Sequence, residues 1–205
     1  MVRFKKAKGI KTIEYDYKMI TTEDYVRDYV EIDRFIECCK MCPNYGAKWG
    51  CPPYAYDVKE KLWDSYKYLH LFTYKMYLED DLVNKDMTRE QIDELVFGIR
   101  HQNYIIASNW VLGVERQNPG SFALDGGHCT KCKRCTRPKG KPCRHEADIR
   151  PALDAIGGNV VKTAKDLFDT EIIWIENGKV PEYFFFIVGI LSNSEEIVVD
   201  KRDAL

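Results

Sequence analysis

The sequence lacks the features that mark several common classes of protein. Its first residues, MVRFKKAKGIKTIEYDYKM, contain no apolar stretch and no small-residue cleavage site, which argues against a secretory signal. The longest apolar run, from Tyr183 to Leu191, is too short to span a bilayer. The formal net charge of −1 argues against binding nucleic acid through bulk charge. We therefore expect a cytoplasmic protein that binds neither membranes nor nucleic acid.

Several motifs of known chemistry are also missing. The chain has no phosphate-binding G-x-x-x-x-G-K-[ST] loop, no dinucleotide-binding G-x-G-x-x-G and no hydrolase G-x-S-x-G turn. The C-x3-C-x2-C triad of radical enzymes that use S-adenosylmethionine is incomplete. Cys38 and Cys42 have its first spacing, but Tyr45 occupies the third position. The sequence therefore leaves open whether the protein is an enzyme.

Cysteine is absent from most of the chain and concentrated in two short stretches. We name residues 38–53 the first cysteine segment and residues 127–145 the second cysteine segment. The eight cysteines are Cys38, Cys39, Cys42 and Cys51 in the first segment and Cys129, Cys132, Cys135 and Cys143 in the second. An even number of cysteines is compatible with disulfides, but a chain of this length does not need disulfide cross-links to be stable. In a cytoplasmic protein, clustered thiols are usually metal ligands or catalysts.

The second cysteine segment has the spacing C-x2-C-x2-C-x7-C. Three cysteines with two-residue gaps form the core of the bacterial ferredoxin run, which holds iron–sulfur clusters. Zinc sites instead favour paired C-x2-C motifs that are separated by a longer stretch. We therefore predict a [4Fe-4S] cluster on Cys129, Cys132, Cys135 and Cys143, with Zn2+ as the alternative metal.

The loop formed by residues 131–144 is strongly basic. It carries seven lysines and arginines and no acidic residue. Cations near a cluster raise its reduction potential, because the cluster and its thiolates are negatively charged. The same charge could dock an acidic redox partner protein. The alternative is a solvated loop that charge keeps soluble.

The first cysteine segment is spaced differently. Cys39 and Cys42 form one C-x2-C pair, and Cys51 follows after eight residues and precedes Pro52. Cys38 is either a fourth metal ligand or a buried small hydrophobic residue. With three thiolates only, a cubane cluster would keep one iron open to a substrate. Alternatively, cysteines of one segment bind the cluster of the other, as in two-cluster ferredoxins.

Around both segments the sequence resembles a family of predicted metal-binding proteins, domain of unknown function 2284. The similarity rests on C-x2-C-x2-Y-G-x2-W-x-C-P-P at residues 39–53 and on G-x-C-x2-C-x2-C…G-x-P-C-R at residues 127–144. The resemblance covers most of the chain, from residue 25 to residue 195. It implies metal binding and gives no reaction. The ligands that it implies are Cys39, Cys42, Cys51, Cys129, Cys132, Cys135 and Cys143, with Cys38 as the outlier.

Hydrophobic periodicity predicts an α+β or mixed α/β fold in a single domain of residues 1–205. We expect a central, mostly antiparallel sheet with one long helix and two cysteine-rich metal-binding loops. The expected strands are Lys11–Met19, Tyr68–Leu78, Ser121–Leu124 and a hairpin of Glu171–Glu176 with Tyr183–Leu191. The expected helices run from Thr21 through Ile36, from Thr88 to Gly113, from Pro151 to Gly157 and from Asn159 to Phe168.

These observations support three hypotheses for function. The first is an iron–sulfur protein, with one or two [4Fe-4S] clusters, that acts in electron transfer as a small redox protein. The second is an enzyme in which a three-cysteine cluster of the first segment acts on a small substrate. The third is an interaction module with structural zinc. The sequence does not identify a substrate or an oligomeric state.

Overall fold

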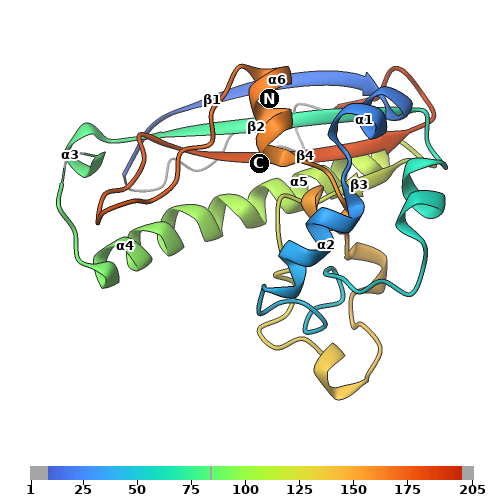
Figure 1. The fold of residues 1–205 in the computed structure, drawn as a ribbon, viewed down its shortest axis with the longest axis horizontal. Helices are drawn as coiled ribbons and strands as arrows, with labels where there is room; N and C mark the ends of the chain where they lie inside the picture. Colours follow the sequence, from blue (N-terminus) through green and yellow to red (C-terminus); the bar gives the residue numbers. More distant parts are fainter. Residues whose placement is uncertain (1–8, 84, 200–205) are drawn as a thin grey trace.

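The computed structural model describes residues 9–83 and 85–199 and confirms the predicted α+β fold. Its centre is an antiparallel sheet with the strand order β1-β2-β4-β3 (Figure 1). The strands are β1 (Ile10–Thr21), β2 (Tyr68–Leu78), β3 (Phe122–Leu124) and β4 (Tyr183–Ser192). The predicted antiparallel sheet is therefore confirmed, because all its ladders are antiparallel.

Six α-helices and several short helical turns complete the described part of the chain. The α-helices are α1 (Thr22–Tyr29), α2 (Ile32–Lys40), α3 (Asp80–Val83), α4 (Arg89–Val96), α5 (Gln102–Gln117) and α6 (Val160–Phe168). Two π-helical turns are η1 (Lys59–Trp63) and η2 (Phe97–His101), and three 3₁₀ turns are η3 (Arg137–Lys139), η4 (Glu146–Asp148) and η5 (Asp154–Ile156). Between residues 9 and 83 and between 85 and 199, every helix is too short or too polar to cross a bilayer.

The two central strands bury both of their faces, because helices cover the sheet on each side. Along β2, Phe72, Tyr74 and Met76 point to one hydrophobic core, and Leu69 and Leu71 point to the other. This alternation follows from the two-residue repeat of a strand. The strand at the edge, β1, follows its alternating sequence only in part: Ile13, Tyr15 and Met19 are partly buried, but Tyr17 on the same face is 45% exposed.

The long helix that packs against the core containing Phe72, Tyr74 and Met76 is longer and less regular than its sequence predicts. It begins as expected at Thr88, whose hydroxyl accepts from the amide of Gln91 while Gln91 bonds back to the amide of Thr88. It then continues through η2 and α5 to Gln117, beyond the predicted end at Gly113. Helix α5 lies below the sheet in Figure 1, and its residues Trp110 and Val111 belong to the same hydrophobic core as Phe72, Tyr74 and Met76.

The helix predicted from Thr21 through Ile36 is wrong in one respect, because it is divided into α1 and α2. The backbone between the two helices bonds to a distant segment instead of continuing the helix. The amide of Glu31 donates to the carbonyl of Gly157 at 2.8 Å, and Val30 forms a bridge with Gly158. Gly157 has a φ of +94°, and a Cβ there would lie 2.8 Å from the Cα of Ile32. This contact fixes the direction in which α2 leaves the sheet.

Two further predictions need correction. The helix predicted from Pro151 to Gly157 is only the 3₁₀ turn η5, which Trp63 holds through its indole N–H to the carbonyl of Ile156. Residues 171–176 do not form a strand, so the predicted hairpin is wrong. Its second half, β4, pairs instead with β2 along its length and with β3 near its end.

A partly buried ion pair connects α5, β3 and the chain just before η5. Arg150 donates from Nε to Glu115 Oε2 at 2.6 Å, and the amide of Ala123 donates to the same oxygen at 2.6 Å. We expect Glu115→Gln to lower the free energy of unfolding by about 3 kcal/mol, because it leaves a partly buried guanidinium without its countercharge. Urea unfolding measures the loss.

The neighbouring pair Arg116–Asp148 provides the control. Its arginine side chain is 67% exposed, so we expect Arg116→Ala to cost less than about 1 kcal/mol. Equal losses for Glu115→Gln and Arg116→Ala would contradict a stabilising role of the partly buried pair.

Candidate metal centre

The first cysteine segment begins on a helix and continues as a closed turn. Helix α2 carries Cys38 and Cys39, and the amide of Cys42 donates to the carbonyl of Cys39 at 2.9 Å just after the helix ends. The chain then folds back, since the amide of Gly46 donates to the carbonyl of Pro52 at 2.8 Å. A helix end and a closed turn therefore bring thiols from both ends of the segment to one place.

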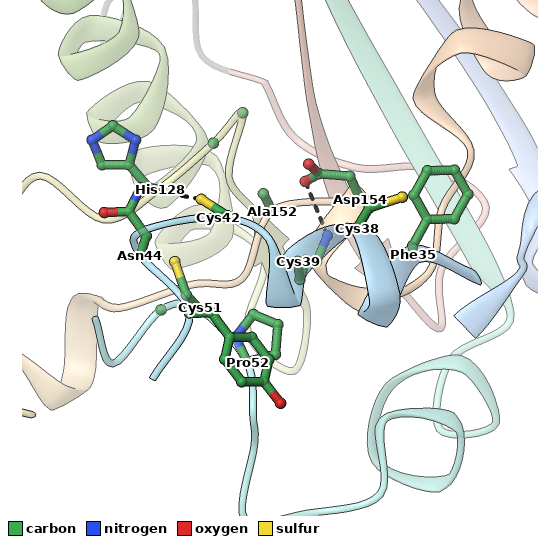
Figure 2. A pocket seen from close by; sticks show the side chains of 15 residues that line it. Phe35, Cys38, Cys39, Cys42, Asn44, Cys51, Pro52, His128, Ala152 and Asp154 are labelled. Atoms are coloured by element: carbon green, nitrogen blue, oxygen red, sulfur yellow. Dashed lines mark hydrogen bonds between the residues drawn. The ribbon is translucent and has the colours of Figure 1, made fainter. Parts of the chain in front are cut away.

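These thiols line one hollow, of about 350 Å³ (Figure 2). All four cysteines of the first cysteine segment contribute to its wall: Cys38, Cys39, Cys42 and Cys51. In Figure 2 the sulfur of Cys38 lies beside Phe35, apart from the sulfurs of Cys42 and Cys51. Cys38 is also exposed, so its interpretation as a buried small hydrophobic residue is wrong.

Burial shifts the protonation of two thiols in the first hollow. It raises the pKa of Cys39 and that of Cys51 to about 11 each; Asp154 adds to the effect on Cys39, and neighbouring thiols add to the effect on Cys51. Burial also raises the pKa of Cys129 in the second cysteine segment. These thiols are therefore protonated at neutral pH when they bind no metal, and a metal that binds them must displace the protons.

Two polar residues of the first hollow were not predicted from the sequence. Asn44 donates from Nδ2 to the sulfur of Cys42 at 3.6 Å. Asp154, at the start of η5, lines the hollow near Cys39, and desolvation by the surrounding wall raises the pKa of its carboxyl even though the residue keeps exposed surface. Neither residue belongs to a recognisable motif, so only the folded chain places them here.

The second cysteine segment has little regular structure and is held by a tryptophan of the first. The indole N–H of Trp49 lies 3.2 Å from the carbonyl of Lys141 and 3.3 Å from the hydroxyl of Thr136. That hydroxyl in turn donates to the carbonyl of Pro142 at 2.8 Å. The amide of His145 donates to the sulfur of Cys143 at 3.3 Å. The predicted loop is therefore a folded structure around η3.

A second hollow, of about 640 Å³, opens on the basic loop formed by residues 131–144. Cys132 and Cys135 line it, together with these cationic residues: Lys131, Lys133, Arg134, Lys139, Lys141 and Arg144. The structure therefore brings two of the predicted ligands into the most basic surface of the segment. Cys129 and Cys143 line neither of the two hollows.

Arg137 joins the two cysteine segments, a role that its sequence position does not reveal. Its guanidinium donates to the carbonyls of Lys48 at 2.7 Å and of Cys51 at 2.5 Å, and also to the carbonyl of Pro53. It also lies over the ring of Trp49, 5.2 Å from its centre. One side chain of the second segment therefore fixes the backbone of the first.

A second contact brings Cys129 directly against the first segment. Lys48 donates from Nζ to the carbonyl of Cys129 at 3.0 Å. A Cβ on Gly50 would lie only 3.1 Å from the Cβ of Cys129, so a larger residue at position 50 would force the segments apart. The two cysteine segments thus form one unit at one end of the molecule (Figure 1).

Within residues 9–83 and 85–199, no three cysteine, histidine or acidic side chains lie close enough together to hold a single metal ion. Six of the eight cysteines line the two hollows. A tetrahedral zinc site needs four ligand atoms about 2.3 Å from one ion. In an iron–sulfur cluster each thiolate binds its own iron, so the thiols stand farther apart. An all-thiol set of side chains can serve as ligands either to zinc or to an iron–sulfur cluster.

A comparison with known protein families finds one match that contains both cysteine segments. The family is described as "Predicted metal-binding protein (DUF2284)", and its model matches residues 18–188. No curated protein and no solved structure matches the chain.

Proposed function

The chain belongs to this family of predicted metal-binding proteins, and we propose that its two cysteine segments hold iron–sulfur clusters through which the protein transfers electrons. The observation that carries the proposal is the direct packing of the two segments, through Arg137 and through Gly50 against Cys129. Two thiol-rich segments in contact would place two metal centres close together, as in two-cluster ferredoxins.

The proposed ligands divide between the segments. Cys129, Cys132, Cys135 and Cys143 would hold a [4Fe-4S] cluster in the second cysteine segment. In the first, Cys39, Cys42 and Cys51 would hold a second cluster, and Cys38 lies outside this set. When bound, such clusters supply one-electron transfer at potentials that the protein sets.

The residues around the thiols would tune these centres. Several cations surround Cys132 and Cys135, and their charge offsets that of ionised thiolates. Around Cys51 the surroundings are drier and less basic, and burial excludes water from the sulfur. Two environments of different polarity favour two different reduction potentials, which gives electron flow a direction.

We further propose that the basic loop formed by residues 131–144 docks an acidic redox partner protein in the cytoplasm. The support is the cationic hollow that also contains Cys132 and Cys135. A partner that binds there would meet the metal centre of the second cysteine segment at its most exposed side. Charge complementarity of this kind accelerates association and weakens as salt is added.

One observation favours a second candidate, an enzyme with an open metal site. The first hollow contains Asn44 and Asp154 in addition to its thiols, and both side chains can bind a polar substrate. Three thiolate ligands would leave one iron of a cubane without a protein ligand. A small polar molecule could then bind between that iron and these side chains.

Metal analysis of the anaerobically purified protein tests the proposed function. We expect brown protein with iron and acid-labile sulfide in equal amounts, about eight of each per chain for two cubanes. Inductively coupled plasma spectrometry and a sulfide assay give the contents, and electron paramagnetic resonance of the reduced protein identifies the cluster type. Colourless protein with stoichiometric zinc and no sulfide would contradict the proposal and favour the interaction module.

A further inference from the structure

A third hollow lies on the other side of the segment that precedes Cys129. It has a volume of about 550 Å³, within the range of small-molecule sites. Its wall contains Phe97 and His101 from η2, Tyr104 from α5 and Phe186 from β4. Residues 126–128 line both this hollow and the first thiol-lined hollow, so only this short stretch of chain separates the two.

Aromatic rings dominate this third hollow and lie in two stacked pairs. The rings of Phe97 and His101 have centres 4.7 Å apart and are inclined by 12°. The rings of Tyr104 and His128 have centres 6.0 Å apart and are inclined by 28°. The hydroxyl of Tyr104 also donates to the carbonyl of His128 at 2.7 Å, which fixes the second pair against the shared wall.

The local structure also marks this place as unusual. Phe97 and His101 are the first and last residues of the π-helical turn η2, which interrupts the long helix between α4 and α5. Such turns often occur at functional sites. Phe97 is 66% exposed although it is a large apolar residue, so it contributes little to the core. An irregular turn that presents an exposed ring to a hollow indicates a binding role.

The charges of this hollow favour an uncharged ligand. Its one carboxylate, on Asp93, forms an ion pair with Arg89 at 3.0 Å. Six of the seven lysines and arginines of the basic loop line a different hollow. The described residues therefore offer flat ring faces without a net charge to attract a phosphate or a carboxylate.

We propose that this hollow binds a planar, uncharged conjugated ring that stacks against Phe97 and His101, next to the thiol-lined hollow. Stacked aromatic groups attract each other beyond the effect of area burial, provided that the rings are offset or tilted. A bound ring would be separated from the first cysteine segment only by residues 126–128. The inference concerns binding alone and does not depend on which metal the thiols hold.

Titration with lumiflavin, a neutral three-ring molecule whose fluorescence falls on stacking, tests this inference. We expect saturable binding to the purified wild-type protein. Phe97→Ala should weaken it about tenfold, because the exposed stacking surface is lost. Trp174→Ala is the matched control, since Trp174 is also 66% exposed but lies outside this hollow. It should leave the dissociation constant within twofold of wild type.

The outcomes are distinct from those of the metal analysis. Saturable binding that Phe97→Ala weakens and Trp174→Ala preserves supports the site, whether the protein contains iron or zinc. Absence of saturable binding to the wild type overturns it. Equal weakening by the two variants also overturns it, because the probe would then be binding exposed aromatic residues in general. Both substitutions are at exposed positions, and matched thermal unfolding curves verify that the variants are folded.

Discussion

Changing Cys132 to serine should remove about half of the iron, whereas Cys38→Ser should leave the metal content close to that of the wild type. Cys132 is the central cysteine of the ferredoxin-like run and lines the basic hollow. A serine hydroxyl is a harder and weaker ligand than a thiolate, so the cluster of the second cysteine segment would be lost. Iron and sulfide per chain, measured after anaerobic purification, provide the comparison.

The adjacent residue Cys39 provides a matched control for Cys38, because both are on helix α2. We expect Cys39→Ser to remove the metal of the first cysteine segment and Cys38→Ser to retain it, since the sulfur of Cys38 lies apart from those of Cys42 and Cys51. Equal metal retention in Cys132→Ser and Cys38→Ser would contradict the assignment of the ligands. Equal loss in Cys38→Ser and Cys39→Ser would rule out an open site with three thiolates.

Removing the side chain of Arg137 should loosen the first cysteine segment without changing its sequence. The guanidinium holds the carbonyls of Lys48, Cys51 and Pro53, and hydrogen bonds of a charged donor contribute about 1.5–3 kcal/mol each when buried. The half-buried position allows water to replace part of this, so we expect Arg137→Ala to cost about 2–3 kcal/mol.

Native-state hydrogen exchange of amides in the first cysteine segment measures this loss of stability locally. The amides of Gly46 and Cys51, which donate to the carbonyls of Pro52 and Lys48, should exchange roughly 30 to 150 times faster in Arg137→Ala. Arg134→Ala, on the exposed part of the same loop, should leave both rates unchanged. Arg137→Lys should not restore protection, because an ammonium cannot reproduce the planar fork of the guanidinium. Unchanged exchange in Arg137→Ala would show that the segments hold together without this side chain.

Much of the scaffold is predictable because its signals are local. The alternation along β2 and the start of the long helix at Thr88 depend on residues close together in the sequence, and both predictions are confirmed. The errors occur where distant contacts override local pattern. The break between α1 and α2 depends on the backbone of Gly157 and Gly158, and the partner of β4 is β2, more than a hundred residues earlier. Periodicity carries no information about either contact.

The candidate site likewise has features that the local sequence predicts and features that only distant contacts create. Cysteine spacing is a local property, and it identifies both segments, whereas the resemblance to the family is what sets Cys38 apart from the other thiols. Spacing does not reveal that Cys129 packs against Gly50, or that Asn44 and Asp154 share a wall with the thiols. Arg137 is one basic residue among seven in its loop, and nothing in the sequence distinguishes it from the others. Its role is visible only when the carbonyls that it binds are in place.

The composition of the two hydrophobic cores determines what happens to the fold when the metal is lost. In the part of the chain that the structure describes, neither core contains a cysteine, and both are built on the sheet and the helices around it. The cysteine segments are attached to one end of a scaffold whose packing does not involve the thiols. Loss of the metal, by oxidation for instance, would therefore leave the packing of the scaffold unchanged. A molecule that has lost its metal could therefore bind new metal without having to refold.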